Sequence, residues 1–398
     1  MNTTQVAVIG QGYVGLPLAL AAAESGFRVF GIDTNESRIN KLSSGISDIE
    51  GISADKLQKQ INIGNYVPVT SYECVKQCDV VIICVPTPLT RDNLPDPSFV
   101  VNAAKAISKL LPENSLVVLE STVSPGFTRS VLFKSLEEFK TAATRVINVA
   151  FSPERIDPIN RDWDIYNTPK ILAGLTKDAS RLAMNFYSQF IKDVVEVESI
   201  EVAETAKLLE NSFRLVNISF INELAIFCNG FGIDVSEVIK AAATKPFGFM
   251  PFYPSLGAGG HCIPIDPAYL LSKSEEIGLP IRSVELALKI NREMPNYTVA
   301  RAEKFLNSLV GKKILVIGVS YKSNVSDVRE TPVGELIAGL ESKGALVYWH
   351  DNLVKKWNDS VSVELSSDYD LAVIATLHDY VDLSKLGNVP IINTKDSI

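Results

Sequence analysis

Residues 6–15 of the chain read VAVIGQGYVG, and this stretch with its continuation to Asp33 decides the fold. Its apolar half predicts a strand and its glycine half a tight turn, and a helix over 16–25 and a second strand over 28–32 are expected to follow. This is the order that a dinucleotide-binding βαβ unit requires, with the pyrophosphate at the helix N-terminus. Asp33 would accept hydrogen bonds from the adenosine ribose and repel a 2′-phosphate, which favours NAD over NADP.

Further apolar runs indicate a parallel sheet with strands buried on both faces. These runs lie at 79–85, 115–119 and 146–150. Long helical patterns replace strands after residue 199, and the run 314–318 then begins a second strand-glycine pattern that lacks GxGxxG. We therefore expect an α/β protein with two doubly wound Rossmann-like domains joined by a long-helix central segment. The expected domain limits are 1–198, 199–300 and 301–398.

Composition argues against several classes of protein. The net charge of −8 disfavours nucleic-acid binding, which needs a basic surface. The sequence contains no run of about 18 uninterrupted apolar residues, so no membrane span is expected. The N-terminus lacks the features of a signal peptide. Five scattered cysteines without a CxxC pair, and only three histidines, predict neither a disulfide framework nor a metal site. A reducing cytoplasm fits this cysteine usage best.

Polar residues follow three of the expected strands. They are Thr87, Thr122 and Glu154, one after each of the apolar runs above. Ligands of open α/β sheets bind beyond the carboxyl ends of the strands. Each residue alone could be an ordinary loop residue, but three at successive strand ends predict a cofactor and substrate site.

Cys262 lies in an unusual segment, GAGGHCIPIDP, at residues 257–267. Glycines let a backbone approach a ligand closely, and prolines fix the turn that presents the thiol. Together with a dinucleotide motif, the segment suggests oxidation through a covalent sulfur intermediate; the alternative is a buried structural cysteine. If the segment is extended, His261 and Cys262 point to opposite sides, so we expect His261 to position the segment.

One long helix is expected over 202–227, and it carries a polar stripe within an arc of roughly 80°. The stripe consists of Glu204, Lys207, Asn211 and Arg214. One interpretation is the solvated face of an amphipathic helix. The other is a face turned to a cleft, where Lys207 and Asn211 could donate to a developing oxyanion.

Seven motifs in a fixed order carry a family resemblance. They are GQGYVGLPLA, CVPTP, ESTVSPG, SPER, ETAKLLEN, GAGGHCIPIDP and GVSYKSNVSDVRETP. Over essentially its whole length the chain resembles the UDP-glucose/GDP-mannose dehydrogenase family. The resemblance implies an NAD-binding domain at 1–198, a central helical dimerisation domain at 199–300 and a UDP-sugar-binding domain at 301–398. It also implies NAD as cofactor, a UDP-sugar substrate, and a homodimer or higher homo-oligomer.

The reaction implied is a four-electron oxidation of the sugar C6 alcohol to a carboxylate with two NAD. Asp266 would be the base of the first oxidation, directly or through water. Cys262 would form a thiohemiacetal and then a thioester, which Glu154 would help water to hydrolyse. Lys207 and Asn211 would stabilise the alkoxide and tetrahedral oxyanions. The implied catalytic residues are Cys262, Lys207, Asn211, Asp266, Glu154 and Thr122.

Binding residues follow from the same resemblance and from the strand ends. The cofactor-binding set is Gly10, Gly12, Tyr13, Val14, Gly15, Asp33, Arg38, Pro86, Thr87, Thr122 and Arg329. The substrate-binding set is Glu154, Arg155, Lys207, Asn211, Arg214, Tyr253, Gly259, Gly260 and Lys322. No metal is expected.

Two departures from the glucose-specific members favour an N-acetylated sugar. Ile265 stands where those enzymes usually have a lysine, and Pro246 stands near a usual arginine. UDP-GlcNAc is the first choice, with UDP-GalNAc, UDP-ManNAc and UDP-glucose as alternatives and a surface polysaccharide as the expected destination of the product. Two other hypotheses stay open: a two-electron dehydrogenase with a structural Cys262, and a non-catalytic sugar-nucleotide sensor.

Overall fold

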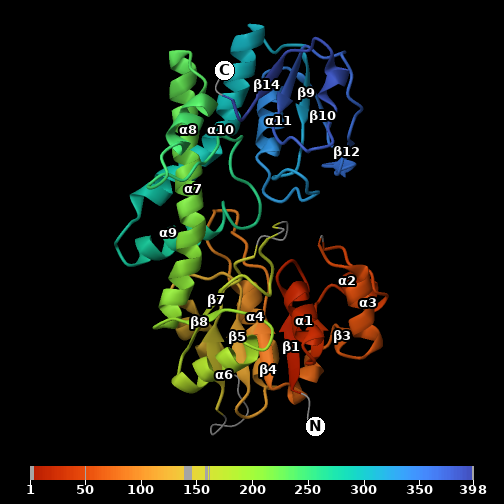
Figure 1. Ribbon diagram of the computed structural model, residues 1–398, viewed down its shortest axis with the longest axis vertical. Coiled ribbons are helices and arrows are strands. Elements are labelled where there is room, and N and C mark those ends of the chain that lie inside the picture. The colour runs from red at the N-terminus through yellow and green to blue at the C-terminus, as the bar shows by residue number, and fades with distance from the viewer. Residues whose placement is uncertain (1–3, 50, 139–145, 157–159, 161, 397–398) are drawn as a thin grey trace. The chain divides into compact units, whose positions relative to one another are not determined.

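The computed structural model describes residues 4–49, 51–138, 146–156, 160 and 162–396 (Figure 1). The chain forms two compact units, residues 1–209 and 210–398, and their boundary falls inside one long helix, α7 (Ile200–Phe231). The α/β class with two sheets and a long-helix segment is confirmed. The expected limits at 198 and 300 stay a prediction.

The first unit is built on an eight-stranded sheet with the order β3-β2-β1-β4-β5-β6-β7-β8. Its strands are β1 (Gln5–Ile9), β2 (Arg28–Ile32), β3 (Tyr66–Val69), β4 (Val80–Ile83), β5 (Leu116–Leu119), β6 (Asn148–Phe151), β7 (Lys170–Gly174) and β8 (Val194–Glu196). The pairs from β3 to β6 are parallel, and β7 runs antiparallel to β6. The order of the first six strands is that of a doubly wound dinucleotide-binding sheet.

Helices cover both faces of this sheet, and two apolar cores result. The helices and single turns are α1 (Gly15–Glu24), α2 (Glu36–Ser43), α3 (Ala54–Asn62), η1 (Tyr72–Gln77), α4 (Ser98–Ser108), η2 (Thr128–Leu132), α5 (Phe133–Glu138) and α6 (Lys177–Tyr187). Side chains alternate along β1, so that Val6 and Val8 pack in the core with α1 while Ala7 and Ile9 pack in the core with α4. This burial on both faces explains why the strands are apolar throughout.

The second unit contains a helical part and a smaller sheet. Its further helices are α8 (Val235–Ala243), α9 (Asp266–Glu276), α10 (Arg282–Leu306), α11 (Val333–Ser342) and the turn η3 (Leu383–Leu386). The parallel sheet has the order β10-β9-β13-β14, with β9 (Lys313–Ile317), β10 (Leu346–His350), β13 (Leu371–Ile374) and β14 (Ile391–Asn393). A small hairpin pairs β11 (Lys356–Trp357) with β12 (Ser360–Val361). Figure 1 shows α11 beside this blue sheet.

The described ranges contain neither a candidate membrane span nor a cluster of metal ligands. None of the helices there combines the length and the apolar character needed to cross a membrane. No three His, Cys, Asp or Glu side chains gather as metal ligands within the same ranges.

Candidate active site

The glycine turn after β1 has open space at one of its three glycines. Gly10 has a φ of +91°, and a Cβ there would lie 2.5 Å from the Cys84 carbonyl oxygen. A Cβ on Gly15 would lie 1.8 Å from the Gly10 carbonyl oxygen, so both positions need glycine for the turn itself. A Cβ on Gly12 would meet no atom within 4 Å. Gly12 therefore faces open space at the start of α1, which fits the pyrophosphate of NAD.

Asp33 follows β2 directly and is held in place by two backbone amides. Its two carboxylate oxygens accept the N–H groups of Gln11 and Asn35, each at 2.9 Å. Arg38 Nη1 lies 3.5 Å from Asp33 Oδ2, and its Nε lies 3.4 Å from Asp48 Oδ1. The carboxylate is thus fixed at the end of β2 with Arg38 beside it, and its contact with an adenosine ribose stays a prediction.

Three predicted residues lie at the carboxyl ends of neighbouring strands. Thr87 comes after β4, Thr122 after β5 and Glu154 after β6, and these three strands are adjacent and parallel. The carboxyl ends of parallel strands share one edge of a sheet, so these residues lie at the same edge as the glycine turn. The sheet thereby brings together the first-unit residues that the sequence predicted separately.

Glu154 lies close to Lys207 of α7. Lys207 Nζ is 3.6 Å from Glu154 Oε2, and both side chains are largely buried. The backbone amide of Ile156 donates to the other oxygen of Glu154. Arg155 Nη1 donates to the carbonyl oxygen of Pro169 at 2.8 Å. The contact between Glu154 and Lys207 thus pairs the predicted hydrolytic base with the predicted oxyanion donor inside the first unit.

Glu204, one turn before Lys207, holds the loop that follows Thr122. Its carboxylate accepts the backbone N–H groups of Gly126 at 2.6 Å and Thr128 at 2.9 Å. Burial raises the pKa of Glu204 to about 7, although these hydrogen bonds favour the charged form. Glu204 and Lys207 are buried, so the interpretation of the stripe as a solvated face is wrong for these two residues. Arg214 at the end of the stripe is exposed.

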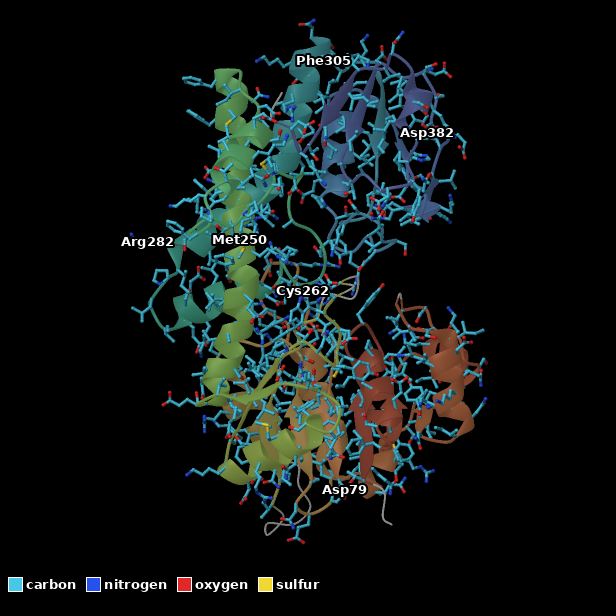
Figure 2. The ribbon with its side chains drawn as sticks, in the orientation of Figure 1. Asp79, Met250, Cys262, Arg282, Phe305 and Asp382 are labelled. Atoms are coloured by element: carbon cyan, nitrogen blue, oxygen red, sulfur yellow. The ribbon has the colours of Figure 1, made fainter. Side chains whose placement is uncertain are left out.

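In the second unit, Asn211 and Asp266 meet. Asn211 Nδ2 donates to Asp266 Oδ2 at 2.6 Å across 55 residues of sequence. Asp266 is the first residue of α9 and only 2% exposed, and its amide donates to the Cys262 carbonyl at 2.9 Å. Cys262 itself is exposed in the loop before α9 (Figure 2). The alternative of a buried structural cysteine is therefore wrong for this structure.

The glycines before Cys262 are explained by protein packing. A Cβ on Gly259 would lie 2.6 Å from the Glu330 carbonyl oxygen, and a Cβ on Gly260 would lie 2.8 Å from the Tyr321 ring. Their small size lets this loop pack on the segment after β9, and their contact with a substrate stays a prediction. Residues 260–265 form bends and a turn, so the expectation that an extended backbone separates His261 from Cys262 is wrong.

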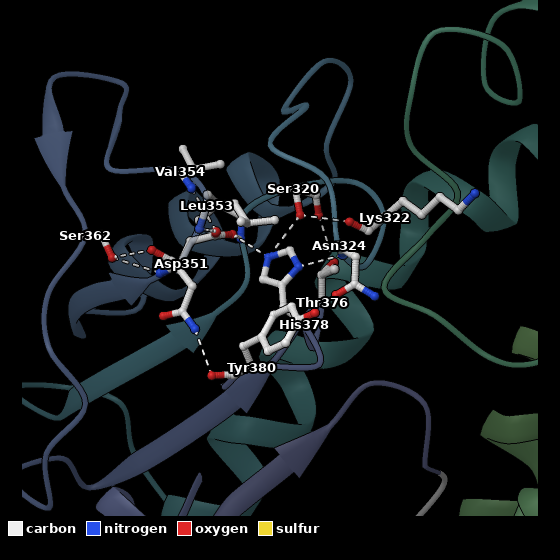
Figure 3. Close-up of polar contacts among 12 residues, drawn as sticks. Ser320, Lys322, Asn324, Asp351, Leu353, Val354, Ser362, Thr376, His378 and Tyr380 are labelled. Carbon is white, nitrogen blue, oxygen red and sulfur yellow. Dashed lines mark hydrogen bonds and ion pairs between the residues drawn. The ribbon is translucent and has the colours of Figure 1, made fainter. Parts of the chain in front are cut away.

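The loop that carries Lys322 is anchored by a buried histidine that the sequence analysis did not assign (Figure 3). The amide of Asn324 donates to His378 Nδ1 at 2.8 Å, and His378 Nε2 lies 3.0 Å from Asp351 Oδ2. Thr376 Oγ1 donates to the Ser320 carbonyl at 2.8 Å at the start of the same loop. Since Nδ1 accepts, the ring hydrogen is on Nε2 and is donated to Asp351.

Asp351 takes a different role from its counterpart Asp33. It follows β10 as Asp33 follows β2, yet it is fully buried. It accepts the amides of Val319, Leu353 and Val354 at 2.8–2.9 Å. Burial alone would raise the pKa of Asp351, but hydrogen bonds from His378 and these amides outweigh it and lower the pKa to about 2. The second sheet thus uses its acidic residue internally.

Solvent exposure divides the predicted residues into three groups. The buried ones are Gly15, Thr87, Lys207, Gly259, Gly260 and Asp266. The half-buried ones are Gly10, Gly12, Tyr13, Val14, Asp33, Arg38, Thr122, Glu154, Arg155, Asn211 and Lys322. The exposed ones are Pro86, Arg214, Tyr253, Cys262 and Arg329. Arg329 Nη2 lies 2.6 Å from Asp327 Oδ2, so this exposed cation is held by a neighbour in its own loop.

Fold and site define an NAD-binding oxidoreductase with a second α/β domain for a nucleotide-linked substrate. Family models agree: the NAD-binding domain of the UDP-glucose/GDP-mannose dehydrogenase family matches residues 4–191, its central domain 201–293 and its UDP-binding domain 315–392. The chain belongs to the UDP-glucose/GDP-mannose dehydrogenase family, and it is an NAD-dependent UDP-sugar 6-dehydrogenase.

Relatives cover nearly the whole chain. The chain is 33% identical to a UDP-N-acetyl-D-glucosamine 6-dehydrogenase of Salmonella typhi, over 95% of this chain and 91% of the relative. It is 32% identical to a UDP-N-acetyl-D-mannosamine dehydrogenase of Pyrococcus horikoshii, over 94% of this chain and 89% of that relative. The solved structure of a UDP-D-ManNAc dehydrogenase from Pyrococcus horikoshii aligns with a TM-score of 0.90 at 30% identity, covering 99% of this chain and 96% of that one.

Proposed function

We propose that this chain oxidises the C6 alcohol of a UDP-N-acetylhexosamine to the carboxylate in two steps, with UDP-GlcNAc as the first candidate substrate. The observation that carries the proposal is the contact of Asn211 with Asp266 beside the exposed Cys262. Bound NAD supplies the hydride acceptor for both oxidations. The open space at Gly12 and the fixed carboxylate of Asp33 support this cofactor.

The first oxidation needs a base for the C6 hydroxyl proton, and Asp266 is the candidate. Its carboxylate accepts a hydrogen bond from Asn211, which orients the group that is to take the proton, directly or through a bridging water. The product of this step is an aldehyde at C6. An aldehyde has no hydroxyl proton to lose, so the second oxidation requires a prior addition.

Cys262 provides that addition. Attack of its sulfur on the C6 carbonyl forms a C–S bond and converts the carbonyl into a hydroxyl, so a second hydride and proton can leave to give a thioester. Water then attacks the thioester carbon, Glu154 takes the proton of the water, and the C–S bond breaks to release the carboxylate and the thiolate. Lys207 and Asn211 are the donors proposed for the oxyanions of these steps.

The choice of sugar rests on two residues and on the relatives. Pro246 and Ile265 depart from the glucose-specific pattern, and relatives at 32–33% identity are named for UDP-N-acetyl-D-glucosamine and UDP-N-acetyl-D-mannosamine. The test is a panel of UDP-GlcNAc, UDP-ManNAc, UDP-GalNAc and UDP-glucose, with NADH counted per UDP-sugar consumed. We expect two NADH with an N-acetylated sugar. One NADH would refute the double oxidation, and none across the panel would favour the sensor hypothesis.

We further propose a homodimer through α7. Four phenylalanines of this helix are exposed, and at 100° per residue they lie on one face. They are Phe213, Phe220, Phe227 and Phe231, with 48–72% of their surface exposed. A second copy related by a two-fold axis offers the same stripe and is the natural cover for it.

Sedimentation equilibrium tests this dimer. The wild-type mass should be that of a dimer, and Phe220→Glu should shift it toward the monomer. Phe305→Glu is the matched control because Phe305 is similarly exposed, at 55%, on a different helix, α10. A monomeric wild type, or an equal effect of both variants, would refute the proposed interface.

A further inference from the structure

A buried ion pair in the first unit lies behind the segment that carries Glu154. Lys170 Nζ is 2.9 Å from Glu120 Oε2, and the Tyr187 hydroxyl donates to Glu120 Oε1. Lys170 is 9% exposed, Glu120 3% and Tyr187 0%. The Lys170 ammonium also lies 4.9 Å from the centroid of the Tyr187 ring. A buried charge pair is weak evidence for stability, so its presence calls for another explanation.

Lys170 links this pair to the residue before Glu154. Besides the bond to Glu120, its ammonium donates to the Pro153 carbonyl oxygen at 3.3 Å. Glu120, Glu154 and Lys170 also line one small pocket. The ammonium therefore ties the carboxyl end of β5, through Glu120, to the start of the Glu154 segment.

Two further contacts hold the same segment from either side of Glu154. Ser152 Oγ donates to the Ile171 carbonyl at 2.9 Å, and Arg155 Nη1 donates to the Pro169 carbonyl at 2.8 Å. Residues 152, 153 and 155 are thus each bonded to the start of β7 or to the residue before it. The carboxylate of Glu154 is meanwhile bonded to the Ile156 amide and lies 3.6 Å from Lys207. These contacts fix the backbone of the segment. The position of the Glu154 carboxylate depends on that backbone.

We propose that Lys170, held by Glu120, is a positioning residue for the hydrolytic step of the reaction; this inference rests on the function proposed above. Through Pro153 it keeps the Glu154 carboxylate where it takes a proton from water as the water oxygen bonds to the thioester carbon. The C–S bond then breaks, and the cysteine leaves as thiolate. No electrons pass in this step, so Lys170 acts on hydrolysis and on neither oxidation.

Lys170→Met tests this assignment in pre-steady-state kinetics on the full-length protein, with UDP-GlcNAc as the first probe and UDP-ManNAc as the second. We expect a burst of two NADH per active site, followed by steady turnover slowed by about 10²-fold, the scale for misplacing a catalytic group. Intact-mass analysis of quenched protein should show the acyl adduct on Cys262. Lys170→Arg should restore much of the rate because a guanidinium also pairs with Glu120 and donates to Pro153.

The control is Lys177→Met, which removes an exposed lysine at the start of α6 and should show wild-type kinetics. If Lys170→Met does not fold, Tyr187→Phe is the second test variant. It removes one hydrogen bond to Glu120 and leaves the ion pair with Lys170 in place. We expect the same burst of NADH and a smaller loss of the steady-state rate. Uniform slowing of the burst and of turnover, with no adduct, would overturn the assignment. Failure of the proposed function is distinguished by the wild type, which would then form only one NADH per sugar or none.

Discussion

Asn211 Nδ2 lies 2.6 Å from Asp266 Oδ2, and this bond joins the middle of α7 to the first residue of α9. The donor comes from a helix that also carries Lys207 one turn earlier, and the backbone amide of the acceptor residue donates to the Cys262 carbonyl oxygen. Because Asn211 has no charge, it orients the carboxylate without neutralising it, and Asp266 stays able to accept a proton.

The first prediction from this arrangement concerns the variant Asp266→Asn. The variant keeps an amide that Asn211 can bond but loses the base, so alcohol oxidation should fall by about 10²- to 10⁴-fold. Oxidation of the corresponding C6 aldehyde depends on Cys262 and should survive to a much larger extent. NADH formation from each substrate measures both rates. Glu275→Gln, an exposed residue of the same helix, is the control and should change neither. An equal loss on alcohol and aldehyde would argue against Asp266 as the first base.

A single added methyl group should lower the stability of the fold at Gly15 and the affinity for NADH at Gly12. Gly15→Ala places a Cβ 1.8 Å from a backbone oxygen, so the first unit should lose about 1–3 kcal/mol of stability or more. Gly12→Ala meets no protein atom within 4 Å and should fold normally, but its methyl takes the space proposed for the pyrophosphate. Thermal unfolding and NADH fluorescence titration separate the two effects. Normal NADH affinity in Gly12→Ala would contradict the proposed cofactor position.

The fold and the first-unit site were largely predictable because their signals are local. The turn at residues 10–15 and Asp33 follow from spacing alone, and apolar runs placed the strands whose ends carry Thr87, Thr122 and Glu154. Spacing along a helix also placed Lys207 and Asn211 on one face. These features depend on residues a few positions apart.

Contacts between distant segments were not predictable in the same way. The pairs Glu120–Lys170 and Asp351–His378 lie 50 and 27 residues apart, and no periodicity relates their members. The packing of Gly260 against the ring of Tyr321 is another such contact, while its contact with a substrate stays a prediction. A single sequence shows that a glycine is small but does not show which atoms approach it.

Asp351 should make the stability of the second unit depend on pH. Its pKa is about 2 in the folded protein, against the ordinary 3.8. Because the folded value is lower, the ionised carboxylate stabilises the fold above about pH 4, and this contribution is lost as the pH falls toward 2. Asp351→Asn should therefore cost about 2 kcal/mol at pH 7, and its difference from wild type should narrow by about 1 kcal/mol between pH 5 and pH 3.

In a Trp163→Phe background, urea unfolding followed by the fluorescence of Trp349 and Trp357, both in the second unit, measures this difference at each pH. A difference that stays constant from pH 5 to pH 3 would show that Asp351 is not held as a low-pKa carboxylate. Glu364→Gln replaces another acidic residue after β12 and should leave the pH profile unchanged.

His378→Gln tests the anchoring of the Lys322 loop. Glutamine can bond either Asn324 or Asp351 in the same space, but it does not reproduce the imidazole that joins both. We expect the KM for the UDP-sugar to rise by about 10-fold and the KM for NAD to rise less, since the anchored residue Asn324 is closer along the chain to Lys322 than to Arg329. Equal effects on both KM values would indicate a general loss of structure instead.

The central claim is that the Cys262 sulfur holds the sugar C6 covalently between the two oxidations, and Cys262→Ala tests it most directly. Incubation of the folded variant with NAD and the preferred UDP-sugar, followed by mass analysis of the nucleotide-sugar, should show no uronic acid. Formation of UDP-linked uronic acid at the wild-type rate by Cys262→Ala would contradict the account.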